Sequence, residues 1–134
     1  MNIRTAQLDD SPALARLDKH ISRQELEHSI RLGRVHVAEK QGKFIGWLRY
    51  NLFWDNTPFM NLLYVLEGSR GNGCGRALVE YWEEQMKQAG YETVMTSTQS
   101  NECAQHFYHK LGYAAVGGFL PPGEAYELIL AKKL

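Results

Sequence analysis

The stretch Asn61 to Leu78, NLLYVLEGSRGNGCGRAL, decides how the rest of the chain is interpreted. It begins as an apolar strand, passes through a polar turn into three alternating glycines, and continues with a helical pattern. Gly71, Gly73 and Gly75 allow the backbone to adopt positive φ and to approach a ligand without obstruction by a Cβ atom. A helix that starts at this point adds unpaired N–H groups and the positive end of its dipole. This order of elements predicts a phosphate-binding turn.

The spacing of the glycines separates this turn from two common phosphate-binding motifs. A P-loop requires Gly-x4-Gly-Lys-Ser/Thr, but neither Lys nor Ser/Thr follows Gly75. A dinucleotide-binding fold requires Gly-x-Gly-x-x-Gly early in the chain and an acidic residue about 20 residues later, and this pattern is absent. Taken alone, the three glycines could also form a tight structural turn between a strand and a helix.

The composition predicts one globular domain that spans residues 1–134. A chain of 134 residues suffices for a single core and is short for two ordinary domains. Fifteen basic and fifteen acidic side chains give a net charge of zero, so neither nucleic acid nor a membrane is expected as a partner. No long apolar run or signal peptide is present, which favours a cytoplasmic location. Cys74 and Cys103 lie in unlike contexts and form no disulfide framework.

The segments before the glycine turn are typical of strands joined by antiparallel hairpins, with two helices after the first strand. The second helix begins at Ser22, where Ser22 and Glu25 form a capping box, and Leu26 and Ile30 supply its buried stripe. Glu25 has the chemistry of a catalytic base, but the capping box favours a structural role for it. The expected strands are Asn2–Gln7, Val35–Glu39, Phe44–Trp54 and Phe59–Leu66.

The segments after the glycine turn predict a crossover connection. A helix with an apolar stripe ends at Gly90, and the strand Tyr91–Ser97 follows it. A strand–helix–strand crossover joins parallel strands, so we expect Phe59–Leu66 and Tyr91–Ser97 to pair in parallel within a mixed sheet. The remaining expected elements are a helix within Ser100–Leu111, a strand at Tyr113–Val116, a Gly/Pro-rich loop at Gly117–Gly123 and a last strand at Ala125–Leu130.

The stretch Ser100–Leu111, SNECAQHFYHKL, is the second informative motif. Asn101 and Tyr108 are seven residues apart, so a helix would place them on one face, about 10 Å apart along its axis. Asn101 is expected as the N-cap of this helix, as a contact of a ligand, or as both. The predicted inward stripe consists of Ala104, Phe107 and Leu111.

Both motifs resemble those of one family. Arg70-Gly71-Asn72-Gly73-Cys74-Gly75 resembles the [Gln/Arg]-x-x-Gly-x-[Gly/Ala] loop of the GNAT N-acetyltransferase superfamily, which holds the pyrophosphate of acetyl-coenzyme A. The second motif is similar to the family pattern Asn-x2-Ala-x2-Phe-Tyr-x2-Leu-Gly-Phe and departs from it only at Tyr113. The strand Leu63-Tyr64-Val65 looks like the fourth strand of the family. The resemblance covers nearly the whole chain and is specific from about Leu62 to Tyr113.

This resemblance implies a fold and an activity. The implied fold is mixed α/β (α+β): a single GNAT-like domain with a central, mostly antiparallel sheet of six to seven strands, a splayed parallel pair, and helices on both faces. The implied activity is transfer of an acetyl group from acetyl-coenzyme A to a primary amine of a small molecule or peptide, by direct attack in a ternary complex. A non-catalytic coenzyme A or nucleotide-binding module is the alternative, followed by a protein–protein module without a ligand. A homodimer is left open.

The resemblance also implies roles for individual residues. Tyr108 matches the tyrosine that gives a proton to the departing thiolate, although it could instead be a core aromatic beside Phe107. A backbone N–H near Val65 is the expected oxyanion donor. The base that receives the proton of the amine is left open among Glu67, Asp55, His28 and His36. The expected cofactor contacts are Leu63, Tyr64, Val65, Arg70, Gly71, Asn72, Gly73, Cys74, Gly75, Arg76, Asn101 and Tyr108.

Two further groups of residues have a structural and a functional interpretation. Cys103 and His109 would lie about 120° apart on a helix, so they do not converge on one ion and no metal is expected. Four aromatic residues of the central strand could line a substrate cleft, but packing in the core is favoured. These four are Trp47, Tyr50, Phe53 and Trp54.

The resemblance places two segments beside the acceptor amine, Asp18–Ser22 and Gly117–Glu124. They are largely apolar and carry few carboxylates that could attract several ammonium groups. We therefore expect a small or modest amine as acceptor and not a polycation.

Overall fold

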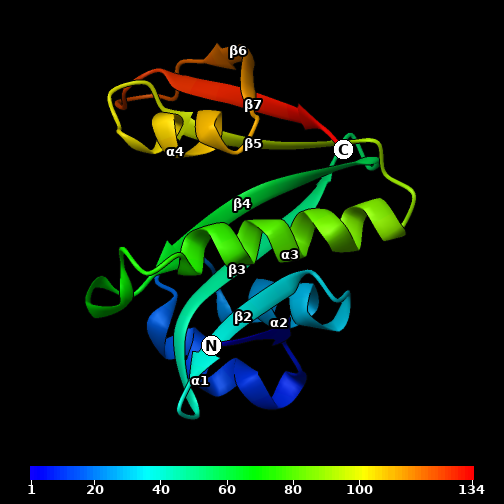
Figure 1. Ribbon diagram of the computed structural model, residues 1–134, viewed down its shortest axis with the longest axis vertical. Helices are drawn as coiled ribbons and strands as arrows, with labels where there is room; N and C mark the ends of the chain where they lie inside the picture. The colour runs from blue at the N-terminus through cyan, green and yellow to red at the C-terminus, as the bar shows by residue number, and fades with distance from the viewer. The chain divides into compact units, whose positions relative to one another are not determined.

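The computed structural model describes all residues from 1 to 134 (Figure 1). The chain forms two compact units, residues 1–51 with 62–82 and residues 52–61 with 83–134. Its seven strands form a sheet in the order β1-β2-β3-β4-β5-β7-β6. None of the helices has both the length and the apolar character needed to cross a membrane. The expectation of a single domain stays a prediction.

The elements follow the expected order. The strands are β1 (Asn2–Thr5), β2 (Val35–Lys40), β3 (Lys43–Phe53), β4 (Thr57–Val65), β5 (Thr93–Gln99), β6 (Ala114–Phe119) and β7 (Glu127–Lys133). The helices are α1 (Ser11–Leu17), α2 (Arg23–Arg31), α3 (Cys74–Gln88) and α4 (Ala104–Lys110), with short 3-10 turns η1 (Leu8–Asp10) and η2 (Glu67–Ser69). β4 and β5 pair in parallel through Phe59–Met95 and Met60–Thr96, whereas β5, β7 and β6 are antiparallel. The mixed, mostly antiparallel sheet with one parallel pair is thus confirmed.

Two turns differ from the sequence-based expectation. The sequence predicts a turn at residues 55–58, between the third and fourth expected strands. In the structure the turn is made by Trp54 and Asp55, with φ of 53° and 63°, and Pro58 lies inside β4. This pair of positive φ values is typical of a two-residue hairpin turn. The predicted loop Gly117–Gly123 begins later, because Gly118 belongs to β6. A Cβ atom on Gly118 would lie 2.5 Å from the carbonyl oxygen of Glu127, so glycine allows β6 to pair with β7 there.

Helix α2 begins as its sequence predicts. The Ser22 hydroxyl accepts a hydrogen bond of 3.2 Å from the backbone N–H of Glu25, which satisfies one of the unpaired donors at the helix start. Leu26 and Ile30 are both buried, and Gly33 follows the helix with a φ of 74°. The cap at Ser22 and the buried stripe of this helix are therefore confirmed, whereas the reciprocal bond of the Glu25 side chain stays a prediction.

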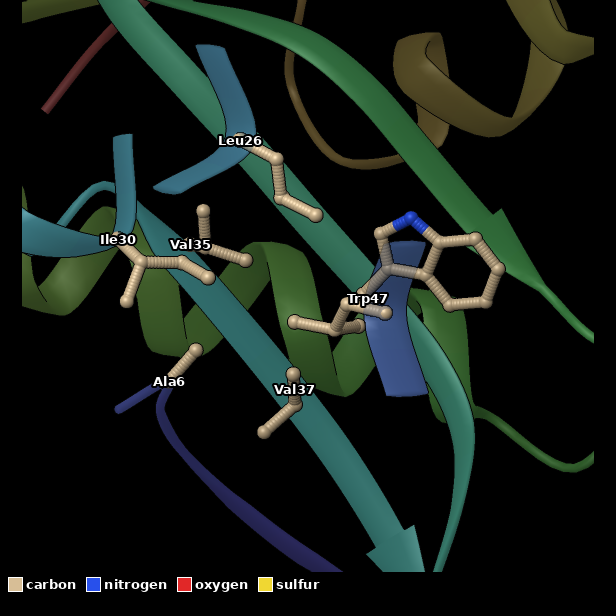
Figure 2. Close-up of a cluster of buried hydrophobic side chains, with 7 residues drawn as sticks. Ala6, Leu26, Ile30, Val35, Val37 and Trp47 are labelled. Atoms are coloured by element: carbon tan, nitrogen blue, oxygen red, sulfur yellow. The ribbon is translucent and has the colours of Figure 1, made fainter. Parts of the chain in front are cut away.

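Alternate residues of β2 contact helices on opposite faces of the sheet in the first unit. Figure 2 shows Val35 and Val37 in a buried apolar cluster with side chains from α2. His36 points to the other face, where its ring lies 5.0 Å from that of Tyr81 of α3 in an edge-to-face arrangement. The complete cluster consists of Ala6, Leu14, Leu26, Ile30, Val35, Val37 and Trp47. Helices on both faces explain why β2 is buried on both sides.

A buried ion pair ties the end of α1 to β3. The side chain of Asp18 is fully buried, and its Oδ2 accepts a hydrogen bond of 2.6 Å from Nε of Arg49. Asp18 also accepts bonds of 3.0 Å from Nε1 of Trp47 and from the backbone N–H of His20. Burial alone would raise the pKa of Asp18, but these donors and the charge of Arg49 lower it below its usual value.

We predict that Asp18→Asn lowers the free energy of unfolding by about 3–5 kcal/mol, because it leaves the Arg49 guanidinium buried without a counter-charge. Since the folded-state pKa of Asp18 is lowered, its contribution is present above the unfolded carboxyl pKa of about 3.9 and is lost as the pH falls through the folded value. Urea unfolding between pH 2 and pH 7, with the exposed Asp9→Asn as control, measures both effects. An equal decrease in the free energy of unfolding in Asp18→Asn and Asp9→Asn would contradict the prediction.

Candidate active site

The glycine turn between β4 and α3 has an open backbone. Gly71 and Gly73 have φ of 82° and 80°, and a Cβ atom on either would meet no protein atom within 4 Å. The N–H of Ala77 donates to the carbonyl of Gly73 at 2.9 Å, so the helical bonds begin here and the preceding N–H groups have no helical acceptor. The turn therefore presents unpaired donors at the positive end of α3, as its sequence predicts.

The side chain of Arg70 holds the turn against the end of β4. Its Nε donates to the carbonyl of Val65 at 2.8 Å, and its guanidinium lies 5.4 Å from the centre of the Tyr64 ring. These contacts fix the position of the residue directly before the glycine turn. A pocket of about 180 Å³ adjoins the turn, lined by residues that include Lys40, Ser69, Asn72 and Cys74. Lys40 adds a positive charge beside the turn.

The backbone of Val65 points away from β3. The N–H of Leu66 donates to the carbonyl of Ile45 of β3 at 2.8 Å. Because successive residues of a strand direct their backbone groups to opposite edges, the N–H and C=O of Val65 face the other edge. Its C=O accepts the bond from Arg70 there, and the role of its N–H as an oxyanion donor stays a prediction.

Gly46 of β3 is a residue that sequence reasoning missed. A Cβ atom at this position would lie 3.0 Å from the carbonyl of Tyr64, 3.1 Å from Sγ of Cys74 and 3.3 Å from Leu78. Glycine here allows the first turn of α3 to approach the sheet closely. A lone glycine inside a strand pattern is a sequence signal for such an approach.

Tyr108 of α4 is buried in the second unit and is 7% exposed. Its ring lies edge-to-face against Phe107 and Tyr113, with centroids 5.1 and 5.6 Å away. Burial raises the pKa of Tyr108 to about 12, a hydrogen bond with Thr96 opposes this rise, and the charge of Glu102 adds to it. The phenol is therefore fully protonated at neutral pH.

A partly buried hydrogen-bond network supports the Tyr113 ring, which contacts Tyr108. The hydroxyl of Tyr113 donates to Oε2 of Glu83 at 2.8 Å, and Nζ of Lys132 donates to Oε1 of Glu83 at 2.8 Å. Burial and the charge of Glu83 raise the pKa of Tyr113, so this hydroxyl remains a donor. The phenylalanine of the family pattern has no such donor. The departure at Tyr113 thus supplies a hydrogen bond to Glu83.

The expected cap of α4 is wrong. The helix begins at Ala104 with Cys103 at the N-cap position, so Asn101 lies outside it and is exposed. The side chain of Gln105 donates to the carbonyls of Ser100 and Glu102 and thereby holds the preceding turn. Asn101 and Tyr108 therefore share no helical face.

The predicted inward stripe of α4 is also wrong. Tyr108 is the buried residue of this helix, whereas the three residues of the expected stripe are only half-buried. Those three are Ala104, Phe107 and Leu111.

The four residues named as candidates for the general base differ in their access to solvent. Glu67, Asp55 and His28 are exposed, but His36 is buried, and burial lowers its pKa to about 4. His36 is thus a neutral core residue.

Two of the four aromatic residues of the central strand, Trp47 and Tyr50, lie in the core as expected, whereas Phe53 and Trp54 are exposed. No group of His, Cys, Asp or Glu side chains is arranged to hold a metal ion.

The predicted cofactor contacts from Leu63 to Arg76 all belong to the first unit, and Asn101 and Tyr108 belong to the second. Their contacts with a ligand stay predictions. Within the first unit, the structure brings together the end of β4, the glycine turn and the start of α3.

Comparisons with known proteins find one family. The profile of the Acetyltransferase (GNAT) family matches residues 3–113. No curated protein sequence matches the chain significantly. A ribosomal-protein-alanine N-acetyltransferase from Brucella melitensis has a TM-score of 0.83 at 23% identity, over 100% of both chains. An acetyltransferase of the GNAT family from Bacillus cereus has a TM-score of 0.80 at 25% identity, over 98% of this chain and 96% of that one. The PaiA N-acetyltransferase from Thermoplasma acidophilum, solved in complex with coenzyme A, has a TM-score of 0.80 at 17% identity, over 99% and 98%.

Proposed function

Because this chain belongs to the GNAT acetyltransferase family, we propose that it transfers an acetyl group from acetyl-coenzyme A to a primary amine of a small molecule or peptide. The amine attacks the thioester directly, within a ternary complex. The observation that carries the proposal is the glycine turn, in which Gly71 and Gly73 have positive φ and open space around them at the start of α3.

The residues of the turn fit the pyrophosphate of coenzyme A. The backbone N–H groups from Arg70 to Arg76 bind the phosphate oxygens, and the dipole of α3 adds to this attraction. Absence of a Cβ atom at Gly73 leaves the space that a phosphate needs. The backbone of Leu63, Tyr64 and Val65 and the side chain of Asn101 bind the pantetheine arm.

Two groups of the chain serve the chemical step. The nitrogen–carbon bond forms while the carbonyl oxygen gains negative charge, which the N–H of Val65 stabilises. The carbon–sulfur bond then breaks, the amine nitrogen loses one proton to water or a nearby base, and the sulfur takes the proton of Tyr108. Acetyl-coenzyme A supplies the thioester that makes the acyl carbon electrophilic.

The acceptor is a small amine or the amino end of a peptide. The Brucella melitensis relative is named for an alanine of a ribosomal protein, which supports a peptide amine. The carboxylate of Asp18, in one of the segments expected beside the acceptor, is buried against Arg49 and is not available to attract an ammonium group. Few carboxylates are then left to select a polycation.

We predict that Gly73→Val weakens binding of acetyl-coenzyme A at least about tenfold, because its side chain fills the space of a phosphate and strains a residue with positive φ. Gly33→Val is a matched control, since Gly33 has a φ of 74° and equally open surroundings. Isothermal titration calorimetry measures the affinity of both variants. Unchanged affinity in a folded Gly73→Val protein would show that the turn is not the phosphate site.

A panel of amino acids, peptides, aminoglycosides and polyamines, assayed by release of coenzyme A thiol, tests the proposed activity. We expect turnover of small amines or peptide amino ends to exceed that of spermidine, for the electrostatic reason given above. Turnover of spermidine or a Lys-rich peptide alone would contradict the acceptor class. Tight binding of coenzyme A without turnover of any amine would instead indicate a non-catalytic binding module.

We predict that Tyr108→Phe lowers kcat about 100-fold, because a positioned acid is lost while the ring and its packing remain. The KM for acetyl-coenzyme A should change little, since the interaction strengthens only as the thiolate forms. Tyr81→Phe is a matched control. It also removes one tyrosine hydroxyl, but that hydroxyl lies 3.4 Å from Thr5 and has no role in the proposed reaction. Single-turnover kinetics isolates the chemical step, and a wild-type rate for Tyr108→Phe would assign the proton to water.

A further inference from the structure

β6 is the last strand of the sheet and pairs on one side only. The strand order ends β5-β7-β6, and the ladder of β6 joins it to β7 (Figure 1). An edge strand has N–H and C=O groups on its outer side that can pair with a strand of another chain. All six residues of β6 are exposed to solvent. The outer side of β6 is therefore open to such pairing.

The sequence of β6 lacks most of the features that protect an edge strand. The usual features are charged side chains, proline, a very short strand and a β-bulge. No charged residue occurs in Tyr113–Gly123, and the first proline, Pro121, follows the strand. An irregular register at Val116, which the ladder with β7 skips, affects one position of six. The strand at the other end of the sheet, β1, has only four residues and carries the charged Arg4.

Apolar side chains are exposed on and directly after β6. Val116, Phe119 and Leu120 are each more than half exposed. Exposed apolar side chains that gather in one patch mark interaction surfaces of soluble proteins. Their removal from water would add a hydrophobic contribution to the pairing of backbone groups.

The residues of β6 are complementary to a second copy of themselves. In an antiparallel pair with a two-fold axis between Val116 and Gly117, Val116 lies opposite Gly117 of the second copy, and Phe119 lies opposite Ala114. Each larger side chain then faces a small one, as close packing requires.

Charge also favours a second copy as the partner. A two-fold axis sets any charge near the middle of a strand beside its own copy, which would weaken the pair, and β6 carries no charge. The whole chain has a net charge of zero, so two copies approach without net repulsion.

We propose that β6 pairs antiparallel with β6 of a second copy of this chain, so that two seven-stranded sheets join across a two-fold axis. Backbone hydrogen bonds between the two strands and the side chains of Val116, Phe119 and Leu120 form the interface. This inference does not depend on the proposed acetyl transfer.

Gly117 is the position at which the pairing can be tested with little effect on a single chain. A Cβ atom there would meet no atom within 4 Å, and its φ is not positive. A lysine is therefore accommodated in one copy, whereas in the pair two ammonium groups lie beside the axis. Gly68 provides a matched control, because it has equally open surroundings and no positive φ but belongs to η2.

The first experiment measures the mass of the chain by sedimentation velocity over a range of protein concentrations. We expect the mass to rise from 15.3 kDa toward twice that value as the concentration increases through the micromolar range. Gly117→Lys should raise the dissociation constant of the dimer about tenfold or more, because like charges meet at the axis. Gly68→Lys should match the wild type. An equal mixture of Gly117→Lys and Gly117→Glu should form a mixed dimer, since opposite charges then meet.

Three outcomes of the first experiment would overturn the proposal. These are a chain that stays a single copy at every concentration, a dimer that Gly117→Lys does not weaken, and failure of the mixed dimer to form from folded variants. Circular dichroism checks that both variants fold. Acetyl transfer is not the readout, because Gly117 belongs to the segment expected beside the acceptor amine.

The second experiment needs no substitution. Amide hydrogen exchange of the wild-type chain is followed by NMR at low and at high protein concentration. The N–H groups of β6 that face away from β7 should exchange more slowly at high concentration, whereas those of β1 should not change. Equal exchange of the β6 groups at both concentrations would overturn the proposal. Protection that appears only when an extended apolar peptide is added would assign the edge to a different protein and would overturn it as well.

Discussion

The close approach of α3 to β3 is the constraint on which the glycine turn depends. The space at Gly46 is filled by the carbonyl of Tyr64, Sγ of Cys74 and the side chain of Leu78, so the helix starts directly against the sheet. Any side chain on β3 at this position would displace the start of α3, because interiors are close-packed. Arg70 secures the other end of the turn by its bond to the carbonyl of Val65. Contacts with β3 and β4 thus hold the N–H donors at the start of α3 in fixed positions.

Each unit also contains a carboxylate, fully buried at Asp18 and partly buried at Glu83, that a cation from a distant segment neutralises. Asp18 is bonded by Arg49 in the first unit, and Glu83 is bonded by Lys132 in the second. Such pairs contribute little net stability when complete, but loss of one partner leaves an uncompensated charge. We interpret them as devices that fix how particular segments pack: Asp18 fixes the chain after α1, and Glu83 fixes Tyr113 and through its ring Tyr108.

The sequence predicts local features well and long-range contacts poorly. The glycine turn, the cap at Ser22 and the parallel pairing of β4 with β5 follow from spacing and short patterns, and the structure has all three. The bonds of Glu83 and Thr96 join residues 49 and 36 positions away, which no periodicity reveals. The start of α4 was mispredicted for a physical reason. Asn101 has the chemistry of a cap, but the helix begins at Ala104, and Gln105 donates to the carbonyls of Ser100 and Glu102 and holds the turn that contains Asn101 outside the helix.

Because Trp54 lies in an exposed hairpin turn, its fluorescence differs from that of the other two tryptophans. Trp54 is 81% exposed and belongs to the second unit, whereas Trp47 and Trp82 are buried in the first. An indole in water emits at longer wavelength than one in a core, and only the exposed ring meets a dissolved quencher such as iodide. The fluorescence of the native chain therefore divides into a quenchable red component from one unit and a protected blue component from the other. Loosening of the first unit can then be followed by the red shift and the gain in quenching of its two buried indoles, against the constant signal of Trp54.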